Sequence, residues 1–194
     1  APAAASPAYF TGPDGKPHPF REAVPGGKSV GVPGNIRMAA LAHEEHGRLA
    51  WAALFEPAIR LAKDGFAITP RLHGALARTD HADMTPEARA LFYGADGRPK
   101  PVGTVVRNPE LAALLESIAA RGPDHFYAGP PAQRLVQTVR NAERNPSVMT
   151  AGDLASYDAK ERAAVCGTYR GHRICGMGPP SSRATTVFAI LKQL

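Results

Sequence analysis

The chain has 194 residues, with 23 Lys and Arg residues against 17 Asp and Glu residues, which gives a formal net charge of +6. Hydrophobic residues make up 44% and charged residues 21%, which excludes a disordered chain and fits about one globular domain. Two cysteines exclude a disulfide-scaffold protein and a four-cysteine zinc site, and no apolar run is long enough for a membrane span. The basic residues are dispersed, so we expect no nucleic-acid partner.

The first third of the chain passes from loop to helix. Residues 1–34 are rich in Pro and Gly and should be mostly loop, and a helix should follow over 36–46, with Asn35 as its N-cap and Gly47 as its stop. A second helical piece should start at Trp51, take a fresh turn at Pro57 and end at Gly65. We expect four of its side chains to point inward: Ala58, Ile59, Leu61 and Ala62.

Three later helices share one starting device, in which a side-chain oxygen at the N-cap precedes a proline. The three N-caps are Thr69, Thr85 and Asn108. The Asn108 helix is the best defined, since Gly122 can end it and its leucines and isoleucine follow helical spacing, at Leu111, Leu114, Leu115 and Ile118. A further helix is expected over 131–143, with Leu135, Val136 and Val139 inward, and a capping box at Thr150 and Asp153.

The pattern changes after Lys160. Residues 164–169 and 172–175 are typical of two strands joined by a turn, which pairs Cys166 with Cys175. The pair is either a disulfide, which implies an exported protein, or two small buried thiols. The sequence therefore predicts an α+β fold, predominantly helical over 1–160, with a C-terminal β-hairpin, a turn and a last helix over 161–194.

Two His-rich or Asp-rich segments resemble metal sites only superficially. His43 and His46 are three residues apart rather than the four that a zinc helix needs, so a solvated helix end explains them better. The segment 80–83 lies in a polar stretch where Asp and His serve turns. We expect no metal and no cofactor.

Two other segments could hold ligands but favour structural roles. Gly31-Val32-Pro33-Gly34 could present backbone N–H groups to an anion, yet it matches no phosphate-loop pattern and fits a helix-entry turn. Ser181 and Ser182 offer hydroxyls but stand outside any nucleophile-elbow motif, and on spacing alone they fit caps of the last helix.

Taken together, eight ordered blocks resemble the large subunit of γ-glutamyltransferases. In chain order the blocks are 31–34, 42–51, 54–66, 108–112, 118–129, 150–157, 169–173 and 179–182. Each block alone is weak, but the ordered set is specific and covers nearly the whole chain.

The resemblance implies a precursor that cuts itself into a large and a small subunit, which stay together as a heterodimer. The assembled fold is then the αββα sandwich of N-terminal-nucleophile hydrolases, and the nucleophile is the new N-terminal Thr of the small subunit. Such an enzyme takes a γ-glutamyl group from glutathione or a similar amide and passes it to water or an amino acid. The family also implies a periplasmic or secreted location, and it points to Ser181 and Ser182 as a substrate-binding turn.

The sequence departs from the family pattern in several places. The nucleophile run is absent, and Thr185-Thr186-Val187 is rejected because it falls inside the last helix. Arg21 stands too close to Gly34 to be the family's substrate-carboxylate arginine; Ala1-Pro2 matches the end of that motif instead. The family's Gly-Gly is replaced by Arg183-Ala184, which puts the substrate class in doubt.

We therefore assign no catalytic residue within these 194 positions and expect an internal fragment of a large subunit. Two other interpretations stay open: a cephalosporin acylase-like member of the same superfamily, and a non-catalytic helical binding module built on the same scaffold.

Overall fold

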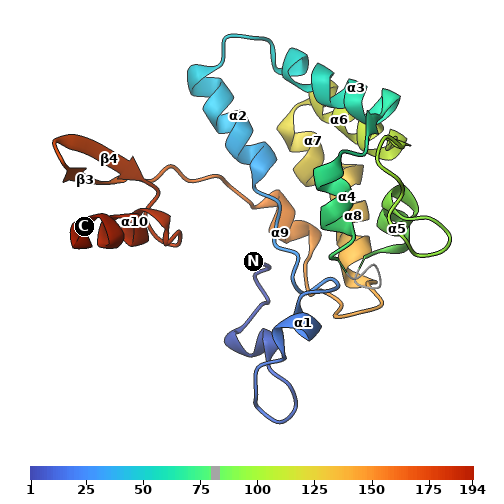
Figure 1. The fold of residues 1–194 in the computed structure, drawn as a ribbon, viewed down its shortest axis with the longest axis horizontal. Helices are drawn as coiled ribbons and strands as arrows, with labels where there is room; N and C mark the ends of the chain where they lie inside the picture. Colours follow the sequence, from blue (N-terminus) through green and yellow to red (C-terminus); the bar gives the residue numbers. More distant parts are fainter. Residues whose placement is uncertain (80–83) are drawn as a thin grey trace. The chain divides into compact units, whose positions relative to one another are not determined.

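The computed structural model describes residues 1–79 and 84–194, which form two compact units, Ala1–Asp158 and Ala159–Leu194 (Figure 1). The boundary falls two residues before the one expected from the sequence. Helices dominate the first unit and a hairpin with one helix makes the second, so the fold is α+β and predominantly helical. None of the helices formed by the described residues has the length and apolar character needed to cross a lipid bilayer.

The first unit is a set of short helices joined by loops. Its α-helices are α1 (Phe20–Ala23), α2 (Asn35–His46), α3 (Glu56–Asp64), α4 (Pro70–Leu76), α5 (Pro86–Phe92), α6 (Pro109–Arg121), α7 (Pro123–Ala128), α8 (Pro130–Arg140) and α9 (Ala151–Ala155). It also contains the 3-10 helices η1 (Pro7–Phe10) and η2 (Trp51–Phe55), and the strands β1 (Phe66–Ala67) and β2 (Val105–Val106), which pair antiparallel.

The side-chain oxygens expected to start helices do so. Thr69, Thr85 and Asn108 each accept a hydrogen bond from the backbone N–H three residues on, which satisfies a donor that the first helical turn leaves unpaired. Thr150 and Asp153 form the predicted capping box of α9. Asn35 is the exception: it is the first residue of α2, and its side chain caps nothing.

The core of the first unit gathers around α6, α7, α8 and α9. Its buried members are Ile118, Phe126, Tyr127, Ala132, Val139, Met149 and Leu154. Trp51 packs against this cluster and donates its indole N–H to the carbonyl of Ile118 at 3.2 Å. The core therefore joins elements from both halves of the unit.

Three predictions about the helices of this unit are wrong. Leu61 is 56% exposed and Ala58 is also exposed, because α3 packs against α6 through a narrower stripe than its periodicity implied. The helix expected over 131–143 ends at Arg140, and a separate helix, α7, precedes it.

The second unit contains β3 (Val165–Tyr169), β4 (His172–Gly176) and α10 (Arg183–Gln193). The predicted hairpin register is confirmed: Tyr169 pairs with His172, and Cys166 pairs with Cys175. Arg170 and Gly171 both have positive φ, as a two-residue hairpin turn requires. Helix α10 packs along the hairpin, as Figure 1 shows.

Candidate functional site

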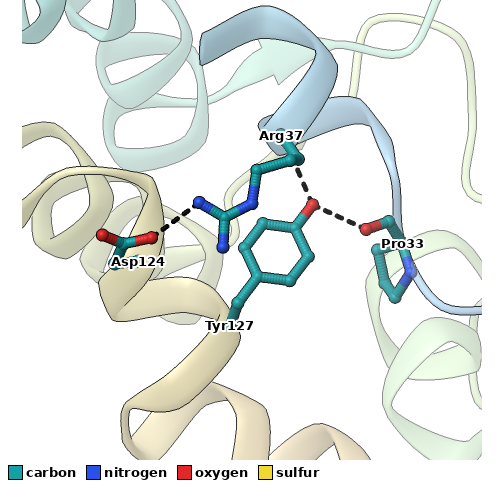
Figure 2. Close-up of polar contacts among 4 residues, drawn as sticks. All are labelled: Pro33, Arg37, Asp124 and Tyr127. Carbon is teal, nitrogen blue, oxygen red and sulfur yellow. Dashed lines mark hydrogen bonds and ion pairs between the residues drawn. The ribbon is translucent and has the colours of Figure 1, made fainter. Parts of the chain in front are cut away.

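The turn at residues 31–34 is held by a tyrosine from α7, far along the chain. The Tyr127 hydroxyl donates to the carbonyl oxygen of Pro33 at 2.6 Å and accepts from the backbone N–H of Arg37 at 3.1 Å (Figure 2). Both bonds fix the entry to α2, which begins at Asn35. The segment is thus a helix-entry turn, the role that its sequence favoured.

The Arg37 side chain completes this cluster. Its guanidinium lies over the Tyr127 ring, 4.5 Å from the ring centre, and pairs with Asp124 at 2.6 Å (Figure 2). The Asp124 side chain is 83% exposed, so the ion pair itself contributes less than about 1 kcal/mol. Burial raises the pKa of the Tyr127 hydroxyl, against the opposing effect of the Arg37 N–H, so the hydroxyl stays protonated and able to donate at neutral pH.

Tyr157 closes the other side of the same turn. Its ring stacks on Tyr127 with centroids 5.9 Å apart. A Cβ atom at Gly34 would collide with the Tyr157 hydroxyl, so only glycine fits there without a shift. No local sequence signal links these residues, since about 90 positions separate the turn from α7.

The Ser181–Ser182 turn lies in the second unit, between β4 and α10. Ser181 Oγ accepts from the Arg183 N–H at 3.3 Å, whereas Ser182 holds the N-cap position without a side-chain cap bond. The capping role expected for both serines therefore applies only to Ser181. The turn follows the cis peptide bond between Pro179 and Pro180.

Contacts with β3 position this turn. Arg162 Nη1, just before the strand, donates to the Pro179 carbonyl at 3.2 Å. A Cβ atom at Gly178 would lie 3.0 Å from Val165 Cγ2, so the backbone passes close to the first residue of β3. The position of the serines thus depends on the pairing of β3 with β4.

Ala184 is buried against β4 in the first turn of α10. A Cβ atom at Gly176 would lie 2.9 Å from the Ala184 Cβ, so the absent side chain at Gly176 makes room for the methyl group at Ala184. Arg183 and Ser182 are exposed, and Ser181 is half-buried.

Cys166 and Cys175 face each other across the hairpin, and their Sγ atoms are bonded in the structure. Both residues are exposed, on the face of the hairpin opposite to that of Gly167 and Gly176, the glycines that contact α10. Arg173 Nη2 lies 3.6 Å from Cys166 Sγ.

The histidines considered as metal ligands serve other contacts. His43 Nε2 lies 2.7 Å from the Leu49 carbonyl, and its ring packs edge-on against Trp51. His46 Nε2 lies 3.5 Å from Oε2 of its neighbour Glu45. Within residues 1–79 and 84–194, no three His, Cys, Asp or Glu side chains are grouped as a metal site would need. The segment 80–83 lies outside the described residues.

A comparison with protein families identifies the chain. The family model described as gamma-glutamyltranspeptidase matches residues 1–194. The chain belongs to the γ-glutamyltranspeptidase family. The resemblance drawn from eight short blocks is thereby confirmed over the full length of the sequence.

Relatives and solved structures agree with this membership. The chain is 34% identical over 167 residues to the glutathione hydrolase proenzyme of Escherichia coli K12, covering 84% of this chain and 28% of that protein. It superposes on the γ-glutamyltranspeptidase of Helicobacter pylori with a TM-score of 0.88 at 30% identity, over 98% of this chain and 54% of that one. A cephalosporin acylase from Bacillus halodurans matches with a TM-score of 0.61 at 28% identity, over 70% and 26%.

The chain thus spans just over a quarter of the Escherichia coli glutathione hydrolase proenzyme and about half of the Helicobacter pylori chain. Thr185 and Thr186, which are not assigned as the family nucleophile, lie within α10, where the Thr186 N–H donates to the Ser182 carbonyl. Arg21 lies in the short helix α1 of the other unit.

Proposed function

We propose that this chain is part of the large subunit of an enzyme that cleaves or transfers γ-glutamyl groups, as in glutathione breakdown. The observation that carries the proposal is the γ-glutamyltranspeptidase match over all 194 residues. The structural match to a γ-glutamyltranspeptidase over nearly the whole chain supports it.

The chemistry needs a group that these residues do not supply. We place the nucleophile on the N-terminal Thr of a small subunit, whose own amine acts as the base. The Thr hydroxyl attacks the γ-carbonyl and the amine of the donor leaves with a proton. Water or an amino acid then takes the γ-glutamyl group from the enzyme, which restores the Thr. We assign to Ser181 and Ser182 the role of a turn that contacts the donor.

The second unit supports an αββα sandwich in the assembled enzyme. Helix α10 on the β3–β4 hairpin is a helix packed on antiparallel strands, the pairing that such a sandwich contains twice. The other strands would come from outside these residues.

Exposed apolar side chains support a partner for the first unit. Leu61 in the last turn of α3, Phe66 in β1 and Val105 in β2 are each at least 40% exposed. We propose that the remainder of the enzyme, with the small subunit, covers these side chains.

The cephalosporin acylase match favours a second candidate, an enzyme that removes the acyl side chain of a cephalosporin. Arg183-Ala184 in place of Gly-Gly, next to the proposed donor turn, is consistent with an altered donor.

The test is an assay of the complete encoded protein with two donors, a γ-glutamyl anilide and an acylated cephalosporin. We expect release of the aniline with little cleavage of the cephalosporin. The reverse preference would favour the acylase, and inactivity toward both would favour a non-catalytic module. The 194-residue chain alone should be inactive, and enzyme-level aniline release by it would contradict the assignment of the nucleophile.

A further inference from the structure

The disulfide of the second unit differs from a buried structural crosslink in its surroundings. Cys166 and Cys175 are exposed, and they occupy the face of the hairpin that α10 does not contact. A disulfide with open access to solvent can be reached by a thiol without prior unfolding. This access belongs to the chain before assembly, because the second sheet of the proposed αββα sandwich would pack on the face that α10 leaves free.

The charge around the two sulfur atoms is unequal. Arg173 Nη2 lies 3.6 Å from Cys166 Sγ, and among the described residues no comparable contact joins a cation to Cys175 Sγ. Residues 159–194 also contain six Lys or Arg residues and one acidic residue. A guanidinium beside a sulfur stabilises the thiolate, so Cys166 is the better leaving group of the pair.

We propose that the Cys166–Cys175 pair is a thiol–disulfide exchange site that takes a dithiol reductant and opens with Cys166 as the leaving thiolate. One thiolate of the reductant attacks Cys175 Sγ, the Sγ–Sγ bond breaks, and Cys166 leaves as a thiolate beside Arg173. The second thiol of the reductant then attacks the mixed disulfide and releases Cys175. The cysteine pair gains two electrons and two protons, and the dithiol becomes a disulfide.

Opening this bond loosens the Ser181–Ser182 turn. Beyond hydrogen bonds between β3 and β4, the turn is tied to β3 by the Arg162–Pro179 bond and by the close passage of Gly178 past Val165. Removing the covalent link between the strands weakens that support. The importance of this effect for donor binding rests on the proposed function, but the opening itself does not.

The first experiment identifies the sulfur that is attacked. The 194-residue chain is treated briefly with limiting 2-mercaptoethanol near neutral pH, and free thiols are trapped with N-ethylmaleimide. Trypsin cuts after Arg170 and Arg173, which separates the two cysteines onto different peptides. We expect the mixed disulfide on Cys175 about threefold more often than on Cys166.

Substitutions at Arg173 distinguish the effect of its charge from a general effect on folding. Arg173→Gln should bring the two mixed disulfides close to equal amounts, and Arg173→Lys should restore the bias toward Cys175. Arg170→Gln is the matched control, because Arg170 lies over the Tyr169 ring, 5.0 Å from its centre, and no contact with either sulfur is recorded for it. Circular dichroism checks that each variant is folded.

An equal distribution in the unmodified chain, an unchanged bias in Arg173→Gln, or resistance of the folded chain to the thiol would each overturn the proposal. Hydrogen exchange of residues 177–182 should rise about twofold on reduction with dithiothreitol, and unchanged exchange there would overturn the link to the turn. Both measurements use the chain without catalysis, so their failure is distinct from failure of the proposed function.

Discussion

Removal of the Tyr127 hydroxyl is the sharpest test of how the first unit holds the entry to α2. In Tyr127→Phe the ring stays under the Arg37 guanidinium, but the hydrogen bonds to the Pro33 carbonyl and from the Arg37 N–H are both lost. At about 0.5–1.5 kcal/mol for each bond, we expect the free energy of unfolding to fall by about 2 kcal/mol.

Urea unfolding measures this loss through tryptophan fluorescence. Trp51 is the sole tryptophan of the chain and packs against the core of the first unit, so its signal reports that unit. Tyr157→Phe is the matched control, since it removes a neighbouring hydroxyl for which no hydrogen bond is recorded among the described residues. A loss below about 0.5 kcal/mol in Tyr127→Phe, or equal losses in the two variants, would refute the reasoning.

Three further predictions concern the capping, pH dependence and redox state. Asn108→Ala should cost about 1 kcal/mol of unfolding free energy in the same urea assay, since its side chain caps the Leu111 N–H. The N–H of Ala3 holds the pKa of the Asp153 carboxyl below its usual value, with further lowering from the capping box. The stability that Asp153 contributes is therefore present above the unfolded-state pKa and is lost as pH falls through the folded-state pKa. In Asp153→Asn the free energy of unfolding should therefore fall less steeply as the solution is acidified. Intact-mass measurement without reductant should find the chain two daltons lighter than after reduction, about one dalton for each hydrogen that the disulfide lacks.

Controls and contrary results for these three are simple. Asn141→Ala changes the C-cap residue of α8, whose side chain makes no hydrogen bond among the described residues, and an equal loss in both asparagine variants would contradict the capping argument. If the free energy of unfolding falls equally with acid pH in the unmodified chain and in Asp153→Asn, the pH argument is contradicted. No mass difference would mean free thiols.

Local chemistry accounts for what could be predicted from the sequence. Asn108 starts its helix because a side-chain oxygen and a proline act within three residues of each other. The Cys166–Cys175 pairing follows from a two-residue turn whose register is set by adjacent positions. The order of the family blocks added the assignment to the γ-glutamyltranspeptidases, now confirmed by the family match.

Long-range contacts account for what could not be predicted. The Tyr127 hydroxyl bonds to the turn before α2, about 90 residues earlier in the chain. Neither helical periodicity nor a capping motif in the sequence indicates that contact. The two-residue strands β1 and β2 pair across nearly forty positions and are too short to show alternation. Leu61 fits the helical pattern yet remains exposed, because what α3 packs against decides burial, and the pattern describes only the helix itself.

The central claim is that γ-glutamyl chemistry in the complete protein uses a nucleophile outside these 194 residues. The most direct measurement is peptide mapping by mass spectrometry after a brief reaction of the complete encoded protein with a γ-glutamyl donor and an acid quench. We predict a γ-glutamyl adduct on the N-terminal Thr of a second fragment and none on residues 1–194. An adduct within those residues, for example on Ser181, would contradict the account.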